Sequence, residues 1–545
     1  MSVVGIDLGF QTCYIAIVKT DENTNNGCIT VIEDDQDNRN TPPCIDFTKR
    51  NRLIGHTGKN KSSNTIWEWK NFIGLSYDDC EKEKEMMLCT VEKAGDSVEF
   101  KVECREQGFT TDQVTAMLFT KLKQIVQSFC NTSELDCVIS VPMHFTQRQR
   151  KLVLNAAEIA GINCLQLFND TTAAALLYYM DHGPFPDNQT QTIVFVDMGA
   201  SSLQVSACEF SSNKFKVLAT AYDTSVGGRY FDQKLADHFC QKIGKNVKSE
   251  KKDYIQLISK CEKLKRLMSV KSNEITIKTD LLGKEECFHM KRKDFVKLTK
   301  DLLGRVRKTF ESLRKKIGTV DQVELIGGST RMPAVKALIE EVFNKVPRTL
   351  LNTDEAVSMG CAHQCGNLSS YCNVKDYPSI ADEQPLIRLK CYSDERKQEE
   401  LLTMQTLEKY AWTVKQHIPF ILEFWYEKTG TLTLKKKIGE VKQTSELVDV
   451  DILFHVDQNG IIKIKAFVME VKGKTTSKMG DEPSEHDIGK FLPIKDADIS
   501  DIKDIQEKKE IELQMIKDDE KEDKRIGLIN LIEENIYRIK NKRKK

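Results

Sequence analysis

Two stretches of the sequence place an aspartate in a turn of small residues directly after an apolar strand. VVGIDLG, near the N-terminus, contains Asp7 and Gly9, and IVFVDMGASS contains Asp197 and Gly199. Small residues in such a turn let backbone N–H groups approach a phosphate, because a Cβ would hold the anion away. Carboxylates and phosphates together are the usual ligands of Mg²⁺. The repeated pattern predicts a phosphate site between duplicated halves, with Asp7 and Asp197 meeting Mg²⁺ through water.

Plainer explanations exist for each candidate taken alone. A single Asp-x-Gly is usually an ordinary turn, since both residues favour turns. Lys70, among aromatic residues, could be a solvated side chain. Asp170 could cap the helix that follows it. The polar side of a predicted helix at 254–270 could simply face solvent. The pairing of Asp7 with Asp197 is what favours a site.

The composition excludes several classes of protein. Lys plus Arg (81) balance Asp plus Glu (81) over 545 residues, so no overall field favours nucleic acid or an anionic membrane. The longest apolar runs are shorter than the roughly 20 residues of a membrane helix. The 17 cysteines are odd in number and scattered, which favours reduced thiols. We expect a soluble, intracellular protein of several domains with no nucleic-acid or membrane partner.

The spacing of apolar residues predicts alternating strands and helices over roughly the first 370 residues. We expect a polar turn at 21–27 after the second strand. The expected strands are 10–18, 137–141, 165–168 and 323–326, and the expected helices are 66–74, 111–130, 147–160, 173–179, 254–270 and one that begins near Pro333. This order indicates an α/β fold with helices packed on sheets.

Nine segments, in order, resemble the nucleotide-binding domain of the 70-kDa heat-shock family. They are GIDLG at 5–9, KNFIG at 70–74, VPMHF at 141–145, NDTTAAAL at 169–176, VDMG at 196–199, GGRYFD at 227–232, EKLKRLMS at 262–269, IGGSTRMP at 326–333 and NTDEAVSMG at 352–360. GFQTCY and NDTTA are more similar to the divergent 110-kDa, nucleotide-exchange branch. The resemblance implies an α/β, actin-like duplicated ATPase domain followed by a β-sandwich domain and a short helical segment.

The resemblance also implies ATP or ADP with Mg²⁺ as cofactors, and it assigns residues to them. Lys70, Asp170 and Asp197 match positions near the terminal phosphate and would be catalytic. Residues matching the phosphate turns and other nucleotide contacts are Asp7, Gly9, Gly199, Ser202, Gly227, Gly228, Gly327, Gly328 and Ser329. Residues matching the adenosine-binding face are Glu262, Lys265, Arg266, Ser269, Arg331 and Asp354. Arg266 and Arg331 would stack on the two faces of the adenine.

Three departures from the family pattern favour slow hydrolysis. Phe10 replaces a residue with a hydroxyl group, and Asp170 is one methylene shorter than the usual Glu. Ala200 and Ser201 stand where the second turn normally has glycines. A misplacement of about 1 Å can reduce a rate on the order of 100-fold. We therefore expect ATP to bind well, and the chain to be at most a slow ATPase.

The last third of the chain resembles the rest of the family more weakly. Strands are expected at 410–415, 420–426, 448–456 and 461–471, with Asn-Gly joining the last two in a hairpin. The tail is expected to be helical, with Ile529, Ile532, Ile536 and Ile539 on one stripe and a basic NKRKK end. The predicted domains are a nucleotide-binding domain at 1–374, a linker at 375–384, a β-sandwich peptide-binding-like domain at 385–473, a polar connector at 474–497 and a truncated helical lid segment at 498–545.

The resemblance implies a molecular chaperone of the 110-kDa heat-shock type. It would hold unfolded polypeptides and promote ADP/ATP exchange on a cytosolic 70-kDa chaperone in the cytoplasm. The basic end could be a nuclear address or simply a solvated end of the chain. One alternative is an ATP-regulated holdase without exchange activity, because the lid would be short. A less favoured alternative is an actin-fold kinase for a small molecule.

Overall fold

The structure is a computed structural model of the 545-residue chain. It describes residues 2–542 apart from 21–26, 35, 59–60, 96, 133, 187–188, 244–246, 372–376, 382–385, 393–396, 404–408, 417–419, 427–430, 439–447, 469–493 and 497–501. The predicted turn at 21–27 and the predicted polar connector at 474–497 lie almost entirely outside the described residues.

The first large sheet has the strand order β12-β11-β1-β2-β3, with β4 beside β2. Its central strand β1 runs parallel to β11 and antiparallel to β2. The strands are β1 (Ser2–Asp7), β2 (Cys13–Thr20), β3 (Gly27–Val31), β4 (Asn40–Thr41), β11 (Leu135–Val141) and β12 (Asn163–Asn169). Helices α2 (Thr111–Cys130) and α3 (Gln147–Ile159) pack on it through apolar side chains. Asp7 is the last residue of β1, so it lies at the C-terminal end of the central strand.

The second large sheet repeats this pattern of strand directions. Its order is β18-β13-β14-β15-β19, and β13 runs parallel to β18 and antiparallel to β14. The strands are β13 (Gln191–Met198), β14 (Leu203–Ser211), β15 (Lys214–Asp223), β18 (Gln322–Ile326) and β19 (Ser379–Ala381). Between the sheets, α4 (Asp170–His182) packs against α10 (Ala356–Leu368). Asp197 therefore has on β13 the place that Asp7 has on β1.

Most of the predicted elements in this part are present. The helix at Thr111–Cys130 has the predicted bounds, and α9 (Pro333–Phe343) begins at Pro333. The predicted helix at 66–74 is wrong: β7 (Thr65–Trp67) is followed by a short 3-10 helix at Trp69–Phe72. Glu68, between them, has a left-handed φ of 55°, which breaks a helix and lets both tryptophans be buried. The second strand begins at Cys13 rather than at residue 10.

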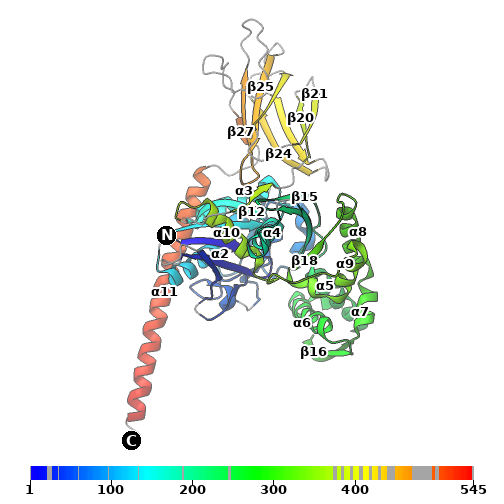
Figure 1. Cartoon of the computed structure of the whole chain (residues 1–545). Helices are drawn as coiled ribbons and strands as arrows, with labels where there is room; N and C mark the ends of the chain where they lie inside the picture. The colour runs from blue at the N-terminus through cyan, green and yellow to red at the C-terminus, as the bar shows by residue number, and fades with distance from the viewer. Residues whose placement is uncertain are drawn as a thin grey trace.

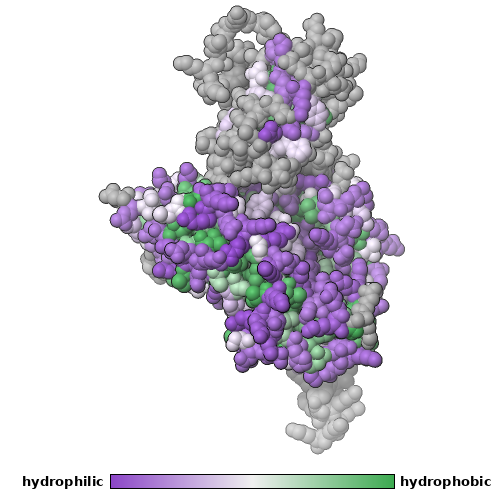
Figure 2. All heavy atoms as spheres, turned by 90° about the vertical axis from the view of Figure 1, so that its right-hand side faces the viewer, coloured by the Kyte–Doolittle hydropathy of each residue, from purple (hydrophilic) through white to green (hydrophobic). Residues whose placement is uncertain are grey.

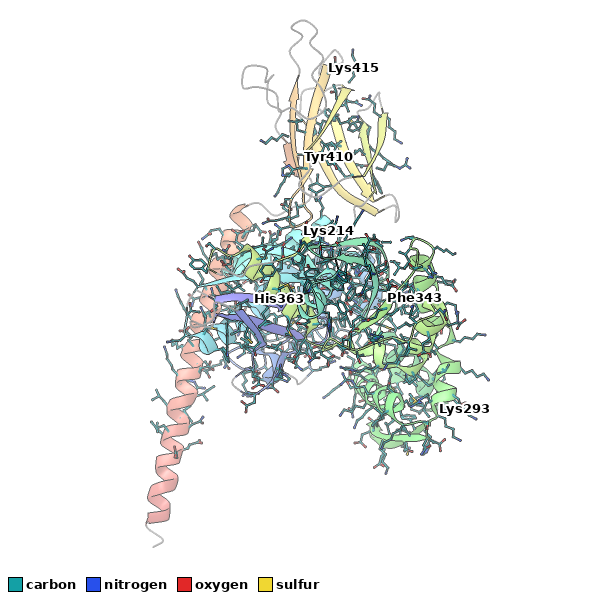
Figure 3. All side chains as sticks on the ribbon, viewed as in Figure 1. Lys214, Lys293, Phe343, His363, Tyr410 and Lys415 are labelled. Atoms are coloured by element: carbon teal, nitrogen blue, oxygen red, sulfur yellow. The ribbon has the colours of Figure 1, made fainter. Side chains whose placement is uncertain are left out.

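The last third contains two further sheets, ordered β21-β20-β23-β24-β27 and β22-β25-β26. The strands are β20 (Leu386–Tyr392), β21 (Lys397–Thr403), β22 (Lys409–Gln416), β23 (Phe420–Tyr426), β24 (Thr431–Ile438), β25 (Val448–Val456), β26 (Ile462–Val468) and β27 (Ile494–Asp496). The four predicted strands are present as β22, β23, β25 and β26, and Gly460 lies in the predicted hairpin turn at φ 74°. Figure 3 shows Lys415 near the outer end of this part and Tyr410 closer to the large sheets.

The predicted linker at 375–384 contains a strand. Ser379–Ala381 forms β19, which pairs in parallel with β15 at the edge of the second large sheet. The hairpin turn between β25 and β26 contacts the first large sheet, where the Leu167 backbone N–H donates to Asn459 Oδ1 at 2.9 Å. The segments on both sides of the linker are thus in contact. The bounds of the predicted domains remain predictions.

A long helix, α11 (Ile502–Lys542), runs along the side of the first large sheet's helices and then beyond them (Figure 1). The predicted helical tail is therefore present, but its buried side is not the predicted isoleucine stripe. Ile529 and Ile532 are exposed, and the side chains at 536 and 539 lie outside the described residues. The apolar contacts come earlier in the helix, from Ile505 and Met515.

A buried ion-pair network joins α11 to the first large-sheet region. Arg52 Nη1 lies 2.7 Å from Glu512 Oε2, and Arg52 Nε lies 2.8 Å from Asp519 Oδ2. The Arg52 and Glu512 side chains are only 2% and 3% exposed. Thr120 Oγ1 donates to the second Glu512 oxygen at 2.9 Å. Such a network fixes the position of the helix, because either charge left alone would be buried without compensation.

One face of the molecule shows how polar and apolar side chains are distributed on the described part of the surface (Figure 2). The face with α8 (Lys300–Arg314) and α9 is mostly hydrophilic, broken by smaller hydrophobic areas (Figure 2). Scattered apolar side chains of this kind are normal on folded proteins. Among the described helices, all are too short or too polar to cross a bilayer.

Replacing Arg52 with Met should release α11 locally. The substitution keeps the volume of the side chain but leaves Glu512 buried without its partner, which costs about 3–5 kcal/mol. Native-state hydrogen exchange should therefore show α11 amides between residues 508 and 519 exchanging on the order of 100- to 1,000-fold faster.

Arg525→Met is the matched control, because Arg525 pairs with Glu522 on the same helix but is half-exposed. An exposed pair of this kind contributes about 0–1 kcal/mol. Equal exchange rates in the Arg52 variant and this control would contradict the buried network.

Candidate functional site

Three carboxylates converge where the two large sheets meet. Asp7 ends β1, Asp197 lies near the end of β13, and Asp170 is the first residue of α4. Gln204, on β14, joins two of them: its Nε2 donates to Asp170 Oδ2 at 2.9 Å and to Asp197 Oδ2 at 3.3 Å. Ser140 Oγ donates to Asp7 Oδ1 at 3.2 Å. The structure thus brings together the aspartates that the sequence singled out.

These carboxylates lie in an environment that opposes their negative charge. Burial raises the pKa of Asp7 from its ordinary value of 3.8 to about 7, and the nearby charge of Asp170 adds to the effect. Burial, followed by the charges of Asp170 and Asp7, likewise raises the pKa of Asp197. The positive charge of Lys70 lowers both pKa values, but less strongly. A site of this kind favours a cation that would stabilise the ionised carboxylates.

One buried oxygen in the cluster has no partner. Asp170 Oδ1 is buried and makes no hydrogen bond to any residue that the structure describes. The helix-cap explanation for Asp170 is wrong, since its other oxygen accepts from the Gln204 side chain and not from a backbone N–H. An orphaned buried oxygen beside two further carboxylates fits hydrated Mg²⁺, which takes oxygen ligands and keeps several waters.

Glycine turns from β13, α5 (Gly228–Ile243) and β18 pack directly on one another beside the carboxylates. The Gly199 carbonyl accepts from the Gly228 N–H at 3.0 Å and from Ser329 Oγ at 2.8 Å. A Cβ on Gly199 would extend into open space next to Asp197, so glycine keeps that space clear. A Cβ on Gly327, whose φ is 78°, would lie 2.7 Å from Asp197 Oδ1. Glycine therefore leaves a space at the first position and permits close packing at the second.

The remaining predicted turn residues lie around this cluster. Ser202 accepts the Gly199 N–H at 3.2 Å through its carbonyl, which closes the second turn. Gly227 packs on the carbonyl of Ala200, and Gly9 packs on the carbonyl of Thr12. Gly328 leaves ordinary contact distance to Arg331. These residues lie in the predicted phosphate turns, and their contact with phosphate stays a prediction.

Lys70 is half-buried, so the explanation as a solvated side chain is wrong. It lies on the short helix Trp69–Phe72, and its Nζ donates to the carbonyl of Leu8 in the first aspartate turn. The ring of Phe145 lies 5.9 Å from the same nitrogen. The lysine charge is thereby held beside the carboxylate cluster.

The predicted adenosine-binding residues of α6 (Lys251–Val270) divide into two groups. Arg266 is 72% exposed and pairs with Glu262 at 2.6 Å. Lys265 instead points inward, where its Nζ lies 2.7 Å from both the Gly228 carbonyl and Asp232 Oδ2. The solvent-facing explanation is therefore wrong for Lys265. Ser269 also bonds within the helix, through Oγ to the Lys265 carbonyl at 3.1 Å.

Arg331 and Asp354 form a second exposed pair, 2.6 Å apart. Arg331 also donates to Thr353 Oγ1 at 2.6 Å. Two arginines, Arg266 and Arg331, are thus held by carboxylates while their side chains remain accessible. Guanidinium groups in that condition can stack on a flat aromatic ligand. Their facing arrangement around such a ligand stays a prediction.

Sequence reasoning missed a contact between the two large-sheet regions. Arg229, on α5, forms a buried ion pair with Glu83 Oε2 at 2.7 Å, and its guanidinium lies 4.9 Å from the centre of the Phe10 ring. Phe10 therefore does more than remove a hydroxyl group, because it packs beneath the arginine. Gln204 was also missed, although a glutamine among the apolar residues of β14 was a signal that could have been noticed. Nothing in the sequence pairs Arg229 with Glu83.

Comparison with known proteins identifies the family. The family model described as Hsp70 protein matches residues 3–545. The chain belongs to the Hsp70 family. Heat shock 70 kDa protein 4 of Homo sapiens is 41% identical over 414 residues, which is 71% of this chain and 48% of that protein. Heat shock 70 kDa protein 4L of Homo sapiens is 34% identical over 530 residues, 89% of this chain and 61% of that protein. The 97 kDa heat shock protein of Mesocentrotus franciscanus is 33% identical over 501 residues, which is 86% of this chain and 56% of that protein.

These relatives confirm the resemblance to the heat-shock family and to its 110-kDa branch. This Hsp70 chain spans about half the length of the first relatives it matches. Proteins of the Hsp70 family bind ATP or ADP with Mg²⁺, and the family implies an actin-like ATPase domain, a β-sandwich and a helical lid. The mixed α/β sheets and long C-terminal helix described above agree with that implication.

Asp197→Asn should stabilise the nucleotide-free protein at pH 7.5. The raised pKa values of Asp7 and Asp197 mean that the native state holds protons that the unfolded chain releases. For Asp197 this contribution to stability is complete below about pH 4 and is lost as the pH rises through its raised pKa of about 8. An amide avoids the loss, so the melting temperature should rise by about 2 °C or more.

Differential scanning calorimetry from pH 4 to 8 checks this, with the exposed Asp280→Asn as the matched control. The gap between the Asp197 variant and the wild type should close toward pH 4. A variant that is less stable than the wild type at pH 7.5 would contradict the unfavourable burial of this charge.

Proposed function

We propose that this chain is an ATP-binding chaperone of the 110-kDa heat-shock type. It holds unfolded polypeptides and promotes the exchange of ADP for ATP on a cytosolic 70-kDa chaperone. The observation that carries the nucleotide part is the convergence of Asp7, Asp170 and Asp197 beside the space left by Gly199. The chaperone part rests on membership of the Hsp70 family and on relatives named as heat shock proteins.

In this proposal the two large sheets belong to the two lobes of an actin-like ATPase domain. Support comes from the same strand directions around β1 and β13, each of which ends near an aspartate. Asp7 and Asp197 would hold Mg²⁺ through water, and the turns at Gly9 and Gly199 would face the phosphates. Arg266 and Arg331 would bind the adenine. The metal would supply positive charge that offsets the phosphates and the buried carboxylates.

Slow hydrolysis of ATP is part of the proposal. Hydrolysis requires a water molecule to be aligned with the terminal phosphate. Asp170 is tied to Gln204, whose Oε1 in turn accepts the Met143 N–H at 2.8 Å. These hydrogen bonds fix the Asp170 carboxylate, at the start of α4, against Gln204 on β14. A carboxylate restrained in this way cannot easily align an attacking water molecule. Binding of Mg·ATP needs only the charge of the carboxylate.

ATP would then act mainly as a ligand that favours one relative arrangement of the two lobes. Two contacts could transmit a movement of the two large-sheet regions to the rest of the protein. They are the pairing of β19 with β15 and the ion pair between Arg229 and Glu83. A ligand shifts such an equilibrium only if it binds the two states with different affinities. We infer that Mg·ATP binds more tightly when the Arg229 contact is made. Location in the cytoplasm and nucleus remains part of this proposal.

The alternatives are weaker or are outcomes of the test. Membership of the Hsp70 family favours a chaperone over a kinase for a small hydroxyl substrate. A holdase that binds ATP without promoting exchange shares the site described above, and only the exchange measurement separates it from the proposal.

The decisive experiment measures release of fluorescent ADP from a cytosolic 70-kDa chaperone. Wild-type chain loaded with Mg·ATP should accelerate release, and Asp7→Asn should not, because its metal site lacks one charge. Asp280→Asn, an exposed aspartate far from the cluster in sequence, should behave as the wild type. Absence of acceleration by an ATP-loaded chain would overturn the exchange function and leave the holdase.

A thermal melt with Mg·ATP separates failure of exchange from failure of the site. Ligand at 100 times its Kd should raise the free energy of unfolding by about 2.7 kcal/mol. An unchanged melt, or the same shift in Asp7→Asn, would overturn the nucleotide site itself.

A further inference from the structure

A β-hairpin at the end of the protein away from the C-terminal sheets exposes a cysteine beside a histidine. The hairpin consists of β16 (Ile275–Leu281) and β17 (Lys284–Met290), and Figure 1 shows β16 at the far end of the second large-sheet region. The alternation of strand residues buries one face of the hairpin and exposes the other. Thr276 lies opposite His289, and Lys278 lies opposite Cys287, all on the exposed face.

Cys287, His289 and Thr276 form a connected series of polar contacts. Cys287 Sγ lies 3.8 Å from His289 Nε2. His289 Nδ1 lies 2.8 Å from Thr276 Oγ1. When Nδ1–H donates to the threonine hydroxyl, Nε2 carries the free lone pair and faces the thiol. A base in that position can take the thiol proton and produce the nucleophilic thiolate.

The other exposed cysteines in the described part of the chain have different surroundings. Cys28 Sγ lies 3.9 Å from the carbonyl of Ile29. Cys104 Sγ donates to the Phe47 carbonyl at 3.0 Å, and burial of its sulfur raises the pKa of the thiol. Among the three exposed thiols that the structure describes, only Cys287 has an imidazole as its hydrogen-bond partner. Chemistry at this sulfur should therefore be faster than at the other two.

An ion pair lies beside the cysteine on the exposed face of the hairpin. Lys278, across the hairpin from Cys287, pairs with Glu285 at 2.7 Å on the same exposed face. The buried face of the hairpin packs on α6, where Gln256 Nε2 donates to Thr279 Oγ1 at 3.3 Å. An adduct on Cys287 would extend into solvent from the opposite face, so it would leave the packing on α6 intact.

We propose that Cys287 is a modification site for small disulfides, with His289 as its base and Thr276 as the residue that positions the base. The thiol proton passes to His289 Nε2, and Sγ forms a bond to one sulfur of the disulfide RS–SR. The S–S bond breaks, and its electron pair leaves with the second sulfur as RS⁻, which takes a proton and becomes RSH. Cys287 is oxidised to the mixed disulfide, and the leaving sulfur is reduced.

The test uses the full chain and oxidised glutathione. The initial rate of mixed-disulfide formation at each cysteine is measured by acid quenching and peptide mass spectrometry. Cys287 should react on the order of tenfold or more faster than Cys28 and Cys104, because His289 Nε2 lies beside its sulfur and can take the thiol proton as a general base. His289→Gln should reduce the rate at Cys287 to that of Cys28, and Thr276→Val should give a smaller reduction.

Cys28 and Cys104 serve as controls within the same molecule, because a misfolded variant would change their rates too. If His289→Gln changes the rates at Cys28 and Cys104, the test rests on Thr276→Val, which should lower the rate at Cys287 alone. Equal rates at Cys287 and Cys28 in the wild type would overturn the proposal. It would also be overturned if Cys287 reacted at the wild-type rate in both variants while the two controls stayed constant.

Discussion

The burial of like charges where the two large sheets meet is the constraint on which the rest of the site depends. Burial raises the cost of ionising Asp7 and Asp197, and the nearby charge of Asp170 raises it further. Ser140, Gln204 and Lys70 offset only part of this cost. A folded protein keeps such an arrangement when a bound cation repays it, and a buried carboxylate oxygen without a described partner agrees with that interpretation.

The elements around the cluster are arranged so that it can form. The parallel and antiparallel pairing of β1 and β13 places an aspartate at the same point of each sheet. The turns after β13 and β18 approach closely enough that Gly327 cannot carry a side chain. Farther away, the ion pairs of Arg229 and Arg52 hold neighbouring segments across long separations in sequence. The carboxylate site would therefore respond if the two large-sheet regions moved relative to each other, as the proposed function requires.

Local features of the fold were predictable because local physics determines them. Apolar periodicity and a capping box at Thr110 define the helix Thr111–Cys130, and Pro333 marks the start of α9. The helix predicted at 66–74 failed because tertiary packing buries both Trp67 and Trp69, which an extended strand and a tight turn achieve better. The carboxylate pair was predictable because each aspartate lies at or next to the end of a strand in the same sequence pattern.

Contacts between distant segments could not be predicted from a single sequence. Lys265 has the spacing of a surface residue, yet Asp232 and the Gly228 carbonyl draw it inward. Arg52 meets Glu512 although the two are 460 residues apart. Charged residues look alike in sequence whether they face solvent or a buried partner. Only the packing of the whole chain decides between these outcomes.

The most direct test replaces Mg²⁺ with Mn²⁺ and follows free Mn²⁺ by electron paramagnetic resonance as ADP is added. If Asp7 and Asp197 hold a metal–nucleotide complex, the wild-type chain should remove the free signal beyond what ADP alone removes. The double variant Asp7→Asn/Asp197→Asn should not. Equal removal of free Mn²⁺ by the wild type and the double variant would contradict the account.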